Sequence, residues 1–445
     1  MTGRRLPRSF FRFPLTPRTR TRTRSTARYA GSLAVCASLL AGCGVLSGSD
    51  SGDDTVKVMT WAPENTRATN KPGMPAMAAA YAKWINSRGG IGGRKIQVLT
   101  CNERNDSVAV ARCARRAADE GVVAVVGSYS QYGDSYLAPL EGAGIPYIGG
   151  YGVTSDELTS PVSYPVNGGQ PALLAGLGRA LAADCGPVTL VRPDSIAGDE
   201  MPPLFDAGLK AGGHPAATDQ LAADDATEYS SASDRALRGA TAEPGNKGCV
   251  VPALGDRTDN FMDSFRRART DFPGVRTATV LGSVDQSLIN ATGGADGPYE
   301  GAYVTSWYPV ASDPRWDSMK KIIDTEAFGD NRIDPADAGV QTTYLAYTVL
   351  KAALERIGTG EVSADTVQHT LDHGLRVGTG GLTPTLHWPD ETPLAAVGFP
   401  RLANADVTVQ VVRGGKLVAA KQDAAGSSTV TDTTSTLEKL DEGRL

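Results

Sequence analysis

The sequence predicts an α/β fold with two domains, each a parallel sheet covered by helices on both faces. Short apolar runs of strand length alternate with amphipathic segments of helical period along the chain. The pattern pauses near residues 164–169 and then starts again. About 400 residues remain after an N-terminal leader, which is more than one hydrophobic core usually serves.

The first domain is expected to alternate strands and helices in the order typical of a parallel sheet. Strands are predicted at residues 56–61, 95–101, 122–126 and 146–148, and helices at 74–87, 107–120 and 136–142. The glycine-rich stretch 89–94 leaves a helix and enters a strand, the reverse of a phosphate-binding loop, so we interpret it as a turn.

The second domain repeats the same pattern. Helices are predicted at residues 171–183, from about 200, and at 260–271, and strands at 188–191, 250–254 and 277–281. An extended segment at 301–309, two long helices at 317–328 and 336–357, and a hairpin-like segment at 407–420 follow. Residues 423–445 are polar and rich in Ser and Thr, which predicts a disordered tail.

The N-terminal leader has the features of an export signal. Residues 1–30 contain nine arginines and no acid, and the apolar run at 29–42 is too short to span a membrane. Leu40-Ala41-Gly42-Cys43 resembles the lipobox of bacterial lipoproteins. This resemblance implies a cleaved signal peptide at 1–42, a lipid on Cys43 and a flexible tether at 43–54. The alternative is a signal peptide whose cleavage site contains a cysteine by chance.

The net charge of the chain limits the partners that it can bind. Without the nine leader arginines the chain has 35 basic and 49 acidic side chains, a formal net charge of −14. Nucleic-acid binding needs a basic surface, so we expect no nucleic-acid partner. No basic patch would hold anionic lipid, so the lipid on Cys43 is the expected tether to the outer face of the cell membrane.

Four further cysteines suit an oxidising compartment and two disulfides. Cys101 ends a predicted strand and Cys113 lies in the next helix, while Cys185 and Cys249 each precede a strand. We predict the pairs Cys101–Cys113 and Cys185–Cys249. Zinc is the competing interpretation, but no CxxC pair supports it, so no metal or other cofactor is expected.

Polar, glycine-rich loops follow the strands of both domains, at the edge where open α/β sheets bind ligands. The loops cover residues 61–64, 127–131, 149–155, 194–198, 255–256 and 282–285. They contain hydroxyls, carboxylates and backbone N–H groups without a nucleophile and base pair, which predicts binding of a small polar molecule rather than catalysis. Gly133-Asp134-Ser135 leaves a GDSL-like esterase as an alternative, although no histidine has the spacing that such an enzyme needs.

Several segments together resemble the leucine/isoleucine/valine-type extracellular solute-binding proteins of ABC importers. They are residues 82–97, Cys101, the strand end at 125–130, and 144–148 leading to 154–159. The resemblance implies two doubly wound, Rossmann-like lobes joined by three crossovers, the periplasmic binding protein-like type I fold. Lobe 1 would comprise 55–167 and about 308–375, and lobe 2 about 168–307 and 376–422.

The resemblance also implies a monomer that closes on its ligand and delivers it to the permease subunits of an ABC importer. A ligand-sensing lipoprotein that signals to a membrane receptor is the alternative. The family's carboxylate-binding residues fall on Ser128 to Gln131 and on Gly152 and Thr154. The second lobe has Ala197 where the family usually has an aromatic residue, and Asp285, with Asp256 behind it, is the candidate partner of a ligand ammonium group. The complete set of predicted ligand-binding residues is Trp61, Ser128, Tyr129, Ser130, Gln131, Gly152, Thr154, Ala197, Asp256 and Asp285.

Overall fold

The computed structural model describes residues 55–441 except 68, 224, 244–246, 281, 283, 389–397 and 425. The predicted signal peptide, Cys43 and the tether lie outside the described residues. None of the helices in the described residues combines the length and the apolar character that crossing a membrane would require.

Lobe 1 is built on a five-stranded sheet. Its strands are β1 (Thr55–Ala62), β2 (Lys95–Asn102), β3 (Ala124–Val126), β4 (Tyr147–Ile148) and β5 (Ser163–Tyr164). Its helices are α1 (Gly73–Asn86), α2 (Ser107–Asp119), α3 (Gly133–Ala143), α10 (Asp317–Glu326), α11 (Ala338–Ile357) and α12 (Ala364–Asp372), with short 3-10 turns η1 (Ser155–Leu158) and η5 (Pro314–Trp316). The strand order is β2-β1-β3-β4-β5, and every pairing is parallel.

Lobe 2 is built on an eight-stranded mixed sheet. Its strands are β6 (Val188–Pro193), β7 (Thr218–Ala222), β8 (Cys249–Pro252), β9 (Arg276–Val280), β10 (Tyr303–Ser306), β11 (Asp406–Arg413), β12 (Lys416–Ala419) and β13 (Val430–Asp432). Its helices are α4 (Gly169–Leu181), α5 (Ile196–Asp199), α6 (Met201–Ala211), α7 (Ser230–Ala240), α8 (Thr258–Ala268), α9 (Gln286–Ala291) and α13 (Thr434–Asp441), with 3-10 turns η2 (Gly255–Arg257), η3 (Arg269–Asp271) and η4 (Gly294–Asp296). The order is β12-β11-β10-β9-β8-β6-β7, with β13 beside β11. The pairings from β7 to β10 are parallel, and those of β11 are antiparallel.

Both sheets are covered on both faces, as predicted. In β3, Ala124 and Val126 join the hydrophobic cluster that includes α1 and α11, whereas Val125 joins the one that includes α2 and α3. Successive side chains of a strand point to opposite faces, so a buried strand must be apolar at every position. Lobe 2 repeats this arrangement, since Leu190 and Val191 of β6 enter different clusters. The predicted doubly wound α/β class is confirmed.

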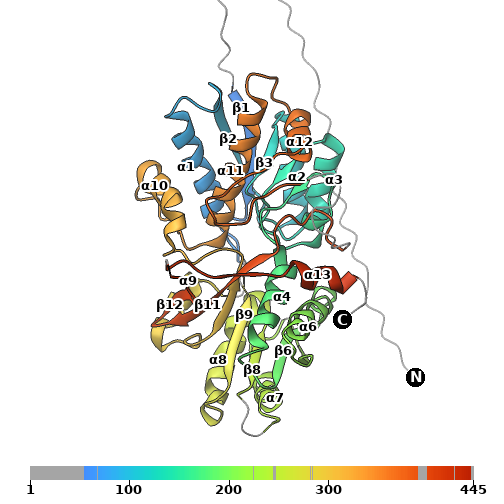
Figure 1. Ribbon diagram of the computed structural model, residues 1–445, viewed down its shortest axis with the longest axis vertical. Helices are drawn as coiled ribbons and strands as arrows, with labels where there is room; N and C mark the ends of the chain where they lie inside the picture. Colours follow the sequence, from blue (N-terminus) through green and yellow to red (C-terminus); the bar gives the residue numbers. More distant parts are fainter. Residues whose placement is uncertain are drawn as a thin grey trace, which may run out of the picture. The chain divides into compact units, whose positions relative to one another are not determined.

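The chain crosses between the lobes three times, after β5, after β10 and before β11 (Figure 1). Buried polar contacts hold these crossovers together. The Tyr308 hydroxyl lies 3.0 Å from Thr342 Oγ1 and accepts a hydrogen bond from Asn167 Nδ2 at 3.3 Å. The Trp307 indole N–H donates to the Gly169 carbonyl at 2.9 Å. The crossovers are therefore part of one continuous hydrophobic core that reaches into both lobes.

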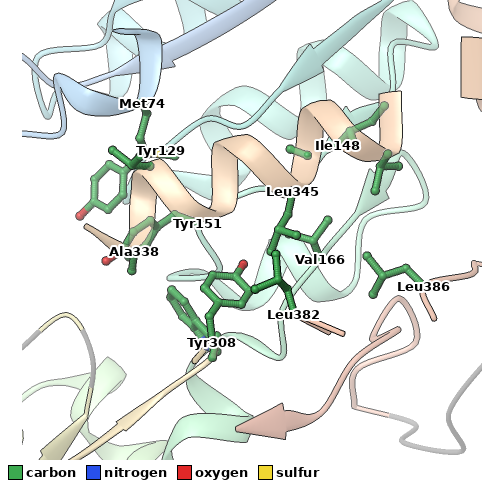
Figure 2. Packing of buried hydrophobic residues seen from close by; sticks show 14 of the residues in the cluster. Met74, Tyr129, Ile148, Tyr151, Val166, Tyr308, Ala338, Leu345, Leu382 and Leu386 are labelled. Atoms are coloured by element: carbon green, nitrogen blue, oxygen red, sulfur yellow. The ribbon is translucent and has the colours of Figure 1, made fainter. Parts of the chain in front are cut away.

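The structure differs from the predicted boundaries in two places. Residues 376–388, predicted in lobe 2, contact lobe 1: the Trp388 indole N–H donates to the Pro165 carbonyl at 3.0 Å, and Figure 2 shows Leu382 and Leu386 close to Val166. Residues 430–441 form β13 and α13 instead of a disordered tail. The prediction failed because it rested on the polar composition of the segment, whereas the buried Leu437 anchors α13 to the core of lobe 2.

Both predicted disulfides are present. Cys101 and Cys113 join β2 to α2 with a Cα–Cα distance of 5.9 Å, and Cys185 and Cys249 are joined at 5.7 Å. The second pair follows from sheet geometry, because β6 and β8 are parallel neighbours in which Val188 pairs with Cys249.

Candidate functional site

Aromatic side chains from both lobes meet near the start of α11. Tyr129 follows β3, Tyr151 follows β4, and Trp307 follows β10 of the other lobe. The Tyr151 ring lies 5.1 Å from each of the other two rings, measured between centroids, in edge-to-face geometry. Figure 2 shows Tyr129 and Tyr151 close to Ala338, in the first turn of α11. They form an aromatic wall (Tyr129, Tyr151 and Trp307) to which both lobes contribute.

A lysine lies against this wall. The Lys71 ammonium is 5.3 Å from the centroid of the Tyr151 ring and 2.9 Å from the Asp337 carboxylate, which caps the N-terminus of α11. The side chains of Lys71 and Asp337 are only 12% and 22% exposed. Burial alone would lower the pKa of Lys71, but Asp337, Tyr151 and Asp285 together attract the ammonium and raise its pKa well above the usual value. Burial opposes ionisation of Asp337 as well, yet Lys71 lowers the pKa of that carboxyl.

Asp285, a residue of lobe 2, lies near Lys71 and Tyr151 of lobe 1. Its Oδ1 accepts the Leu288 N–H at 2.8 Å and so caps α9, which orients the carboxylate. Its charge acts on both Lys71 and Tyr151, two residues of lobe 1. Asp285 also lines a pocket of about 300 Å³ together with Ala338 and Gln341 of α11. A predicted ligand-binding residue of lobe 2 therefore faces lobe 1.

The backbone N–H groups of the predicted carboxylate-binding loop already bind a carboxylate of the same protein, that of Glu157. The Glu157 carboxylate accepts the backbone N–H groups of Gly152, Val153 and Thr154 at 3.0, 3.2 and 3.3 Å. A side chain at Gly150 would overlap this carboxylate, so the loop needs glycine there. Burial raises the pKa of Glu157 to about 7, although the hydrogen bonds oppose that rise. The N–H groups of Gly152 and Thr154 are thus already bonded within their own loop.

The predicted ligand-binding residues in the loops at 61–64 and 127–131 are mostly buried and contact other protein groups. Ser128 Oγ accepts the Trp61 N–H at 3.0 Å, and Ser130 Oγ donates to the buried Glu103 carboxylate at 3.2 Å. The Trp61 ring is buried against Tyr136 and Tyr147. These three residues support the loops from within.

The remaining predicted residues lie apart from the aromatic wall or are not described in full. Gln131 is exposed, as is Ala197 on α5, where the neighbouring Ile196 is 86% exposed. Asp256 lies in η2, and its side chain is outside what the structure describes. Of the ten predicted residues, the structure thus places Tyr129 in the aromatic wall and Asp285 near Lys71 and Tyr151.

Sequence reasoning missed Lys71, Tyr151, Trp307 and Asp337. Tyr151 lies within a loop singled out as ligand-facing, so listing every side chain of that loop would have found it. Lys71 precedes α1 in a polar segment, and Asp337 precedes α11 as an N-cap residue, which is also the commonest structural role for an aspartate there. Only the tertiary packing brings Lys71 and Asp337 together beside Tyr151.

The chemistry at the alternative esterase motif is limited. Ser135 Oγ donates to Asp134 Oδ1 at 3.3 Å, and within the described part of the chain no histidine hydrogen-bonds to Ser135. His369 and His373 stack at 3.9 Å between ring centroids, one helical turn apart. Across the described residues, no group of three or more His, Cys, Asp or Glu side chains is arranged to hold a metal ion.

Comparison with known proteins agrees with this fold. A model of the family described as "Periplasmic binding protein" matches residues 66–397. No curated protein matches the sequence. Three solved structures of similar fold are a substrate-binding periplasmic protein from Ralstonia solanacearum (18% identity, TM-score 0.64, covering 82% of this chain and 99% of that chain), a leucine-binding protein from Thermotoga maritima (16%, 0.63, 85% and 99%), and an ABC-transporter solute-binding protein from Rhodopseudomonas palustris in complex with p-hydroxybenzoic acid (14%, 0.65, 86% and 98%).

The match to the family model extends over most of the chain, and the similar structures have the same two-lobed α/β architecture. The chain therefore belongs to the periplasmic binding protein family and has its type I fold.

Proposed function

We propose that the protein is an extracytoplasmic solute-binding protein that captures a small polar ligand, amino acid-like or amide-like, and delivers it to an ABC importer. The observation that carries this proposal is the convergence of both lobes on one site. Lys71 and Tyr151 come from lobe 1, and Trp307 and Asp285 follow strands of lobe 2. The similar structures include solute-binding proteins of ABC transporters.

Capture would follow from lobe closure. A ligand held by groups of both lobes stabilises the closed arrangement, because only that arrangement makes both sets of contacts. The three crossovers allow one lobe to rotate on the other, and the permease would recognise the closed form. In this proposal Tyr129, Tyr151 and Trp307 cover the apolar part of the ligand, and Asp285 binds its ammonium or amide group. Gly152, Thr154 and Ala197 would contact the ligand only after their loops rearrange, and Asp256 stays a candidate beside Asp285.

The lipid on Cys43 would keep this binding protein at the outer face of the cell membrane. The tether at residues 43–54 is rich in Gly, Ser and Asp, a composition typical of flexible linkers. A short flexible tether raises the effective concentration of the binding lobes near a membrane permease. Mass spectrometry of the N-terminal peptide tests the proposal, since it expects a diacylglyceryl group on Cys43 that Cys43→Ala removes.

A thermal-shift screen with amino acids, amides, ureas and small sugars tests ligand capture. A ligand at 100 times its Kd should stabilise the protein by about 2.7 kcal/mol. Small-angle scattering of the stabilised complex should then show a smaller radius of gyration, as expected for closed lobes. Stabilisation by sugars alone would contradict the ligand class, and a stabilised complex of unchanged radius would contradict closure.

A further inference from the structure

The pocket beside Asp285 receives polar side chains from both lobes. Its lining includes Gln341 of α11, Gln410 of β11, Ser306 at the end of β10, and Lys416. Gln341 and Gln410 are 4% and 6% exposed. A buried side-chain amide is unusual in a protein interior, because it loses its hydrogen bonds to water unless protein or ligand groups replace them.

Each glutamine uses its nitrogen within the protein. Gln341 Nε2 donates to the Pro335 carbonyl at 2.9 Å, and Gln410 Nε2 donates to the Tyr308 carbonyl at 3.3 Å. Among the described residues, neither Oε1 atom has a hydrogen-bond donor. Each amide group is therefore held by one backbone carbonyl and keeps its acceptor oxygen and one N–H donor for whatever enters the pocket.

The charges of the lining favour the same kind of ligand group. Asp285 uses Oδ1 to cap α9, which leaves Oδ2 as a further acceptor with a negative charge. Of the described residues that line the pocket, Lys416 is the one cation, and it is exposed. An anionic group inside the pocket would meet the like charge of Asp285, whereas a group rich in N–H donors could bond to this carboxylate and to both amide oxygens.

We propose that Gln341, Gln410 and Asp285 bind the N–H-rich end of the solute: an ammonium, guanidinium or primary amide group. This inference rests on the proposed function and narrows it, since it assigns the donor end of the ligand to this pocket. The rest of the ligand then extends toward the aromatic wall.

Three probes that differ in their end group test the assignment by isothermal titration calorimetry: agmatine, pentanamide and pentanoate. Agmatine and pentanamide are expected to bind, and pentanoate is not. Gln341→Met and Gln410→Met keep the side-chain length but remove the acceptor, and each should weaken agmatine by about tenfold or more, as expected for the loss of a charged hydrogen bond. Lys416→Ala is the matched control at the pocket rim, and it should leave agmatine binding unchanged or slightly stronger because it removes a like charge.

Circular dichroism establishes that each variant is folded before titration. If a methionine variant does not fold, Asp285→Asn replaces it, because asparagine caps a helix as well as aspartate does. The proposal is overturned if pentanoate binds as tightly as agmatine, if no probe binds, or if the folded variants keep the wild-type affinity. A solute that stabilises the protein and closes its lobes, but is insensitive to these variants, would leave the proposed function standing and remove only the donor-end assignment.

Discussion

Two groups of charged side chains lie at the edges of the sheets, and they differ in where their hydrogen-bond and charge partners come from. The Glu157 carboxylate is buried and is surrounded by N–H groups of its own loop. The second group comes from three separate segments: Lys71 and Asp337 form an ion pair within lobe 1, and Asp285 belongs to lobe 2. A loop that satisfies its own polar groups is a structural unit, whereas the position of Asp285 relative to Lys71 depends on how the lobes pack, so we expect it to change with lobe movement.

The largest expected effect concerns Glu157 and pH. Burial raises the pKa of Glu157 from 4.5 to about 7. Between pH 4.5 and pH 7, Glu157 is therefore mostly protonated in the folded protein and mostly ionised in the unfolded chain. Folding stability should therefore fall as pH rises from about 4.5 to 7, by about 3 kcal/mol from this group. Urea denaturation of the wild type and of Glu157→Gln across this range measures it.

The difference in unfolding free energy between these two proteins isolates Glu157 from the other groups that titrate over the same range. A difference that stays constant with pH would show that the loop holds Glu157 ionised throughout, with full compensation by the backbone N–H groups.

Breaking the Lys71–Asp337 ion pair should have a smaller effect on stability. Lys71→Met leaves the Asp337 carboxylate without its cation, and we expect a loss of about 2 kcal/mol, below the value for fully buried pairs because both side chains are partly exposed. The double variant Lys71→Met/Asp337→Asn should recover most of this loss, since no unpaired charge remains. Equal unfolding free energies for the single and double variants would mean that the ion pair contributes little beyond the packing of the lysine stem.

Asp285→Asn should change stability least of the three, by less than about 0.5 kcal/mol, because asparagine also caps helices well. Its effect should appear in binding, where the affinity for an ammonium-bearing ligand is expected to fall by more than about tenfold. Unchanged affinity in calorimetry would remove Asp285 from the site, and Asp285 would then be a helix cap alone.

The sequence was most informative where burial dictates composition. Val122 to Val126 had to be apolar at successive positions because β3 is covered on both faces, and the parallel α/β class followed from such runs. It was least informative for elements with a mixed pattern. The strand β7 and the helices α7 and α12 were not predicted, since β7 is largely exposed and polar, and α7 is rich in Ser, Arg and Ala.

The candidate site was predictable only in part. The sheet edge and Asp285 followed from the position of each loop after its strand, whereas Lys71 and Trp307 did not, because each reaches the site from a segment outside the expected loops. Gly152 and Thr154 show the opposite case. Their position at the sheet edge was predicted, but the bonding of their N–H groups to Glu157 depends on how the loop folds back on itself.

By itself the sequence determined the fold class and the two disulfide pairs, because these follow from strand burial and from local order along the chain. The sheet edge at which a ligand binds stays a prediction of the same kind. Only the tertiary structure decided which charges meet beside the aromatic wall, which lobe residues 376–388 join, and which glutamines line the pocket. The physical reason is distance along the chain. Lys71 and Asp337 lie 266 residues apart, so no local pattern encodes their contact, and only the packing of a complete core brings them within 2.9 Å.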